Sequence, residues 1–333
     1  MTDRRTVLAA VGSSALAIGA MKAGITLAAT GPSPAAANFL AMLEPAEAEA
    51  ARFDFGDTTH RRWNFMGTRV KPGLLLERMS ADQKAAAEVL LRTLLSEAGY
   101  AKIRLIMATQ DVMRELGRGP SDRNSERFSI AVFGTPGPDL WGVRIEGHHL
   151  SLSWTLSGDR IVAITPASFS VIPQHITVGE LRGTVVLERE EGLGRRLIGD
   201  LAGGKRERAL FAERSPGNVL AMAGEEDRFT AKQGIAAAEL VDAQRDLLWE
   251  LIETTTVEPW PTPIADQQRI RIREGDPEAV HFAWAGGREP GEMFYYRIHG
   301  DTFVLEFASV FRDPEHLHAV YHDPQRTLGR HMT

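Results

Sequence analysis

Histidine side chains gather at two places in this sequence of 333 residues, which holds ten histidines in all. His148 and His149 are adjacent, and His316 and His318 are separated by one residue. Neutral imidazole is a common ligand of zinc, copper and iron. Because His-x-His on a strand projects both rings to one face, His316 and His318 are expected to offer two ligands to one ion. We expect His149 to join them, with His148 as a fourth or alternative ligand.

The first histidine pair lies in a predicted strand that also carries charged groups. Alternation along an unbent strand places Arg144, Glu146 and His148 on one face and His149 on the other. A bulge at Gly147 would exchange the faces of the two histidines. We expect Glu146 to act as a general base or to orient a ligand, and Arg144 to hold an anionic group or to pair with Glu146.

Metal-bound histidines usually donate their second ring nitrogen to a carboxylate or a carbonyl. By their place in the motifs, Glu146 and Glu306 are the expected partners of the ligands. His322 is a further histidine in the second cluster, and it would share a face with His318 at i, i+4 if that segment were helical instead.

The N-terminus has the pattern of a twin-arginine signal peptide. Arg4 and Arg5 precede an apolar run, and Lys22 follows it. Three alanines that end at Ala37 form a small-residue cleavage site. The sequence therefore predicts a signal peptide over residues 1–37, one domain over residues 38–333, the twin-arginine export machinery as a partner, and a periplasmic or secreted protein. The alternative is an uncleaved anchor helix or a disordered tail.

Composition excludes several classes of protein and site. The chain has no cysteine, which removes disulfides, thiolate zinc sites, iron–sulfur clusters and blue-copper centres. A net charge of −6 argues against a nucleic-acid partner and against a polybasic membrane surface. No later apolar run approaches the length of about 20 residues that spans a bilayer, so we expect no stable membrane insertion.

Hydrophobic periodicity favours helices and strands that are segregated along the chain. Helices are predicted after a capping box at Ser80, over 101–116, over 188–202 and over 235–255. One long strand is predicted over 141–156, and further strands are predicted near 128–132, 161–164, 280–285, 294–298, 303–307 and 317–321. No internal repeat is evident. The pattern predicts an α+β fold, in which a meander and the C-terminal strands form one antiparallel sheet with helices on one side or end.

The same residues resemble a family that has no assigned activity, domain of unknown function three-thousand-five-hundred. The resemblance rests on Phe133-Gly134-Thr135-Pro136, the run from Trp141 to Leu152, Phe282-Ala283-Trp284, Tyr295-Tyr296-Arg297-Ile298, and Leu305-Glu306 followed by His316-x-His318. It implies that both histidine clusters belong to the family pattern. The chain departs from that pattern at Phe307-Ala308-Ser309 and at Tyr321-His322-Asp323, so His322 is not carried over as a ligand.

These observations favour an exported, metal-dependent enzyme that acts on a small-molecule substrate. Zinc would imply hydrolysis, whereas copper or iron would imply oxidation. One alternative is a periplasmic metal- or ligand-binding module without turnover, and another is acid–base catalysis by the histidines and Glu146 without a metal. An enzyme should have a deep pocket beside the histidines, whereas a sequestering module could expose them.

Overall fold

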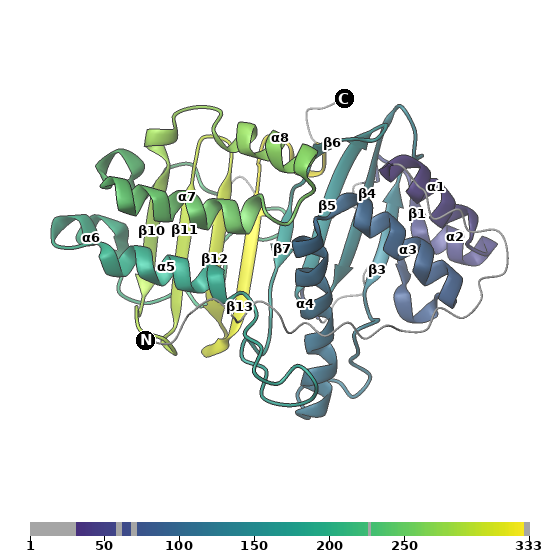
Figure 1. Cartoon of the computed structure of the whole chain (residues 1–333), viewed down its shortest axis with the longest axis horizontal. Coiled ribbons are helices and arrows are strands. Elements are labelled where there is room, and N and C mark those ends of the chain that lie inside the picture. Colours follow the sequence, from purple (N-terminus) through teal and green to yellow (C-terminus); the bar gives the residue numbers. More distant parts are fainter. Residues whose placement is uncertain (1–30, 58–61, 68–71, 226–227, 330–333) are drawn as a thin grey trace, which may run out of the picture.

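The computed structural model describes residues 31–57, 62–67, 72–225 and 228–329 (Figure 1). Its centre is one mixed sheet of 13 strands, whose main order is β1-β3-β4-β5-β7-β13-β12-β11-β10-β8. The α+β class and the union of the meander with the C-terminal strands are as predicted. The sheet is not purely antiparallel, because β1 runs parallel to β3 and β8 runs parallel to β10. Both exceptions are two- or three-residue strands at the ends of the sheet, too short to leave an alternation signal.

The strands are β1 Arg52–Phe53, β2 Leu74–Leu75, β3 Ser129–Phe133, β4 Leu140–Gly147, β5 Leu150–Ser157, β6 Arg160–Ala163, β7 Ala167–Phe169, β8 Leu210–Ala212, β9 Ile235–Ala236, β10 His281–Gly286, β11 Phe294–His299, β12 Val304–Val310 and β13 Asp313–His322. The α-helices are α1 Pro32–Ala41, α2 Pro45–Ala51, α3 Ala81–Leu94, α4 Glu97–Glu115, α5 Glu188–Asp200, α6 Gly204–Ala209, α7 Asp242–Thr256 and α8 Thr262–Ile272.

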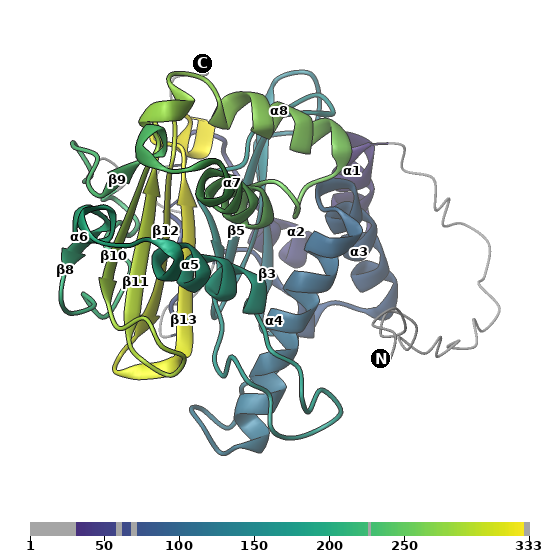
Figure 2. The ribbon, with the colours of Figure 1, turned by 60° about the vertical axis from the view of Figure 1, so that its left-hand side comes forward.

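Helices α3, α4, α5 and α7 lie over one face of the sheet (Figures 1 and 2). The large apolar core lies between them and the strands, and it includes Trp154, Phe282 and Tyr296. In the part of the chain that the structure describes, loops rather than helices cover the opposite face. A second, smaller apolar cluster there joins Trp63 and Phe65 to Val219, Tyr295, Val310 and neighbouring strand residues. His316, His318 and His322 alternate with core residues along β13, so they face this loop-covered side.

Local signals explain most element boundaries. The Ser80 side chain accepts a hydrogen bond from the Gln83 backbone N–H, and the Gln83 side chain accepts one from the Ser80 backbone N–H, as the capping box predicts. The predicted helix over 235–255 begins only at Asp242, because Ile235–Ala236 pair with β10. Pro263 stands in the first turn of α8, where its missing N–H costs nothing.

The structure contains an internal repeat that the sequence analysis missed. The N-terminal repeat (residues 73–157) and the C-terminal repeat (residues 234–310) share one order of elements: a short strand, a 3₁₀ turn, two helices and three antiparallel strands. Gly73 and Gly234 begin the repeats with φ values of 110° and 100°. A Cβ would lie 2.6 Å from the Ile130 carbonyl oxygen at the first glycine and 2.1 Å from the Phe282 carbonyl oxygen at the second. Backbone geometry is therefore what the two copies keep in common.

The strands of the two repeats follow the same order, but from opposite ends of the sheet. From each end of the sheet inward, the order is β3-β4-β5 in the N-terminal repeat and β10-β11-β12 in the C-terminal repeat. Strands β7 and β13 lie between them and pair antiparallel through Ala167 with Tyr321 and Ser168 with Val320. A single continuous sheet therefore joins both repeats, and its middle is the seam between them.

The predicted signal peptide falls mostly outside the described residues, which begin at Gly31. The predicted cleavage point after Ala37 lies inside α1, where Ala35, Ala36 and Phe39 are buried in the main core. A cut there would divide the helix and separate Ala35 and Ala36 from that core. Across the described part of the chain, no helix combines the length and apolar character that crossing a bilayer requires.

Candidate metal centre

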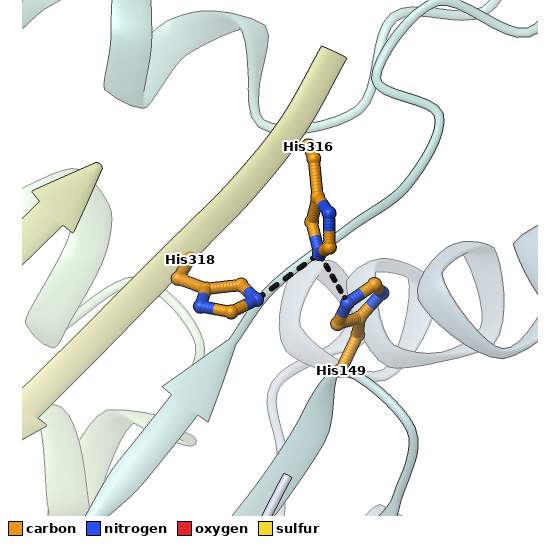
Figure 3. Close-up of side chains that lie close together, drawn as sticks. All are labelled: His149, His316 and His318. Carbon is orange, nitrogen blue, oxygen red and sulfur yellow. Dashed lines mark hydrogen bonds between the residues drawn. The ribbon is translucent and has the colours of Figure 1, made fainter. Parts of the chain in front are cut away.

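Three histidine rings from the two clusters converge at the seam between the repeats (Figure 3). The Nε2 atoms of His149 and His316 are 2.8 Å apart, and those of His316 and His318 are 3.1 Å apart. One nitrogen from each ring lies within 4.8 Å of the others. The predicted convergence of His149, His316 and His318 is thus confirmed. His149 and His318 are buried, whereas His316 is half-buried.

His149 is presented by a hairpin turn. The strand predicted over 141–156 is in fact two strands, because His148 and His149 alone connect β4 to β5. His149 has φ 72°, a left-handed conformation that non-glycine residues seldom adopt. Its backbone N–H donates to the Phe65 carbonyl at 2.8 Å, and its carbonyl accepts from the Ser170 N–H at 2.8 Å. These two bonds hold the strained residue with its ring toward β13.

The β13 histidines are fixed by a loop partner that the sequence analysis did not identify. His318 Nδ1 lies 2.8 Å from the Asn218 side-chain oxygen. Since an amide oxygen only accepts, Nδ1 carries the proton and Nε2 presents its lone pair to the centre. The Phe65 ring meets the His318 ring edge-on, with centroids 4.9 Å apart. Nothing in the irregular stretch around Asn218 marks it as special in the sequence.

Glu306 organises this loop instead of binding a histidine. Its carboxylate accepts from the backbone N–H groups of Leu220 and Ala221 at 2.7 and 2.9 Å, and from the Tyr295 hydroxyl at 2.7 Å. Burial raises the pKa of Glu306, and these hydrogen bonds oppose that rise. The expectation that Glu306 is the partner of a ligand nitrogen is therefore wrong. Glu306 positions the loop, and Asn218 makes the contact.

Glu146 has a similar supporting place on the other side of the centre. It accepts from the Ser151 hydroxyl at 2.9 Å and from the Asn64 backbone N–H, and its second oxygen lies 3.6 Å from Arg144 Nε. Arg144 and Glu146 are each 1% exposed. The predicted pairing of the two is present, but Glu146 is not among the groups that surround the trio. It anchors the segment whose Phe65 carbonyl holds His149.

His148 lies beside the trio rather than in it. Its ring stacks on the His149 ring, with centroids 3.6 Å apart, and its Nδ1 lies 2.6 Å from Arg123 Nη1 and 2.9 Å from the Gln110 side-chain oxygen. The structure therefore does not place His148 as a fourth ligand. A cavity of about 460 Å³ opens next to it, lined by His148, Arg123 and Gln110 among others.

His322 is separated from the trio. It is fully buried, its Nε2 lies 3.2 Å from the Ala221 carbonyl oxygen, and its ring meets Trp63 edge-on at 5.3 Å. It belongs to the packing of the loop-covered face, and it is not part of the group of histidines that could hold an ion.

Burial keeps the trio in the state that metals bind. Burial is the main cause that lowers the pKa of His149 and of His318 well below the usual range, and it lowers the pKa of His316 to about 4. Neighbouring imidazoles lower the pKa of His149 and His318 further. Three neutral imidazoles therefore face one another at neutral pH, and neutral imidazole is the form that coordinates a metal.

The residues present fit a transition-metal ion. Bonds of about 2.1 Å at a tetrahedral ion place two ligand nitrogens roughly 3.4 Å apart. The separations of 2.8 and 3.1 Å are close to that value, and a small movement of half-buried His316 would open them. The trio contains only nitrogen donors, which suits zinc or copper and disfavours magnesium and calcium.

The fold and the site define an α+β protein with a three-histidine centre at the junction of two repeats. The pattern of a family described as a protein of unknown function (DUF3500) matches residues 29–330, and the chain belongs to this family. No curated protein and no solved structure is significantly similar to the chain.

Proposed function

We propose that this protein is a metal-dependent enzyme whose ion is held by His149, His316 and His318. The observation that carries the proposal is the meeting of three Nε2 atoms from two segments more than 160 residues apart. Three protein ligands leave a coordination position open, which is the pattern of catalytic rather than structural zinc sites. Non-haem iron centres of the common kind use two histidines and a carboxylate, and among the described residues no carboxylate joins this trio. The donor set therefore favours zinc or copper.

The chain's own residues orient the ligands and shield them from water. Asn218 holds the tautomer of His318, and the Phe65 carbonyl holds the backbone of His149. Glu306 and Glu146 fix the two loops that carry these groups. When bound, zinc would supply Lewis-acid chemistry for hydrolysis, and copper would supply electron transfer for oxidation. His316 is half-buried, so a small substrate would approach the centre from the side of His316.

The alternative of a sequestering module without turnover is less well supported. Such a module could carry its histidines on the surface, whereas His149 and His318 are buried and a cavity lies beside His148. The export signal of residues 1–37 and a periplasmic or secreted location belong to the proposal. The twin-arginine route exports proteins that are already folded, so the metal ion could be bound in the cytoplasm before transport.

Metal titration of the purified protein tests the site. We expect one zinc or copper ion per chain, and binding that is lost in His316→Gln and His318→Gln. His281→Gln is the matched control, because His281 is half-buried and lies on β10 with its Nδ1 2.8 Å from the Ala279 carbonyl oxygen. Equal binding by all four proteins would refute the site.

Cobalt(II) substitution separates an enzyme from a sequestering module. A site with an open position should change its visible spectrum when azide is added, because azide enters the coordination sphere. A spectrum that does not respond to azide would support storage and contradict catalysis.

A further inference from the structure

We propose that the cavity beside His148 is the subsite for an anionic group of the substrate, a carboxylate or a phosphate, and that Arg123 binds it. The proposal rests on the proposed function, since it names the class of substrate that reaches the three-histidine centre. The cavity lies between the segment 120–127, the C-terminal part of α4 and the β4–β5 turn. Its volume of about 460 Å³ is within the range of small-molecule sites.

The charges that line the cavity are mostly positive. Arg78, Arg123 and Arg127 contribute to its wall, against one carboxylate from Asp122. Arg127 is paired with Asp122 and lies 3.8 Å from Glu77. Within the described residues, Arg78 and Arg123 form no ion pair, so their charges remain available to a ligand. Guanidinium binds carboxylate and phosphate through two parallel hydrogen bonds.

Arg123 is held in place by neutral groups. Its Nη1 lies 3.1 Å from the Gln110 side-chain oxygen and 2.6 Å from His148 Nδ1, and Gln110 is 2% exposed. Burial lowers the pKa of Arg123, although the group stays charged. A half-buried cation without a carboxylate partner is costly to the fold, and a bound anion would offset that cost.

The corresponding place in the C-terminal repeat shows how such a cavity can be closed. There the Thr302 hydroxyl donates to the Arg271 carbonyl at 2.8 Å, and Asp301 accepts from the Asp276 N–H at 2.9 Å. The N-terminal repeat has an open cavity at this place, whereas the C-terminal repeat closes it with these direct contacts.

The position of Arg123 connects the subsite to the metal centre. Its guanidinium contacts His148, and the His148 ring stacks on His149, so a single imidazole separates the proposed anion from a ligand. An acidic substrate bound there would extend its remaining atoms toward the centre.

Calorimetric titration with inorganic phosphate and with acetate tests the subsite, in zinc-loaded and in metal-free protein. We expect one anion per chain in both forms, with at least tenfold weaker binding in Arg123→Gln and a smaller loss in Arg123→Lys. Arg78→Gln, on the exposed rim, should weaken binding less than Arg123→Gln. Arg214→Gln is the matched control, because Arg214 lines a separate cavity near Glu213. The tighter of the two anions identifies the group that the subsite accepts.

The outcomes separate this inference from the proposed function. Anion binding that is equal in wild type and Arg123→Gln would overturn the subsite, even if zinc binds normally. Anion binding that disappears on metal removal would also overturn it, because the ion itself would then be the anion's partner. If zinc fails to bind while the anion still depends on Arg123, the anion site stands, but its assignment as the substrate site of a metal centre is overturned.

Discussion

The two repeats use one backbone plan for different tasks. The β4–β5 turn of the N-terminal repeat corresponds to the β11–β12 turn of the C-terminal repeat. By the strand register, Asp301 and Thr302 stand at the positions of His148 and His149. Asp301 binds Lys232 at 2.6 Å, and the Thr302 hydroxyl donates to a backbone carbonyl, so this turn is structural. The N-terminal turn instead carries a metal-ligating type of side chain toward β13. The centre therefore lies where the turn of the N-terminal repeat meets β13, the strand that follows the C-terminal repeat.

Loss of the His149 ring should have the largest effect of any change in this comparison. Since His149 has a positive φ, Asn is the suitable replacement, because Asn tolerates that conformation. We predict that His149→Asn lowers metal affinity more than about 100-fold, beyond the loss typical of an outer partner. The thermal midpoint without metal should change little. Metal titration and calorimetry of the same sample measure both quantities.

His149→Thr, which copies the residue at the equivalent Thr302, sharpens that test. A β-branched residue is strained at a positive φ, so this variant should lose metal binding and also unfold at a lower temperature than His149→Asn. Equal thermal midpoints for the two variants would contradict the account of the turn.

The glycines that begin the two repeats should be equally intolerant of substitution. Gly73→Ala and Gly234→Ala would each place a Cβ against a strand carbonyl at a positive φ, so we predict a loss of about 2 kcal/mol or more in the free energy of unfolding. Gly192→Ala on α5 is the control, because no atom lies within 4 Å of its Cβ position. It should leave stability unchanged or raise it. Urea unfolding of the three variants would decide whether the repeats share this constraint.

Removal of the loop partner should have an intermediate effect. Asn218→Ala leaves His318 without the oxygen that fixes its tautomer, so metal affinity should fall about 10- to 100-fold. Asn38→Ala, on an exposed part of α1, serves as the control. Unchanged affinity in Asn218→Ala would show that the tautomer is set in another way.

The smallest effect is expected at the turn between β12 and β13. Arg312 is exposed and has φ 63°, so Arg312→Gly should relieve backbone strain and stabilise the protein by up to about 1 kcal/mol. Arg312→Ala keeps the strain and should not stabilise. If Arg312→Gly unfolds at a lower temperature than the wild type, the arginine side chain stabilises the fold by more than the backbone strain at this position destabilises it.

Residue types predicted the centre, but not the geometry that builds it. His-x-His spacing identified His316 and His318 as neighbours on one face, because alternation along a strand is a local property. The turn at His148 and His149 was missed because neither residue is a usual hairpin turn former. Asn218 was missed because its role depends on a loop that Glu306 fixes from a distant strand. The repeat was missed because its copies conserve φ values and register more than side chains.

The central claim is that His149, His316 and His318 hold one ion, and X-ray absorption spectroscopy tests it most directly. The protein should be purified from its native compartment without added metal, and spectra recorded at the zinc and copper edges. The account predicts one ion per chain with about three imidazole nitrogens at roughly 2.0 to 2.1 Å, and the loss of this signal in His149→Asn. A protein that carries no ion, or an ion whose spectrum is unchanged in His149→Asn, would contradict it.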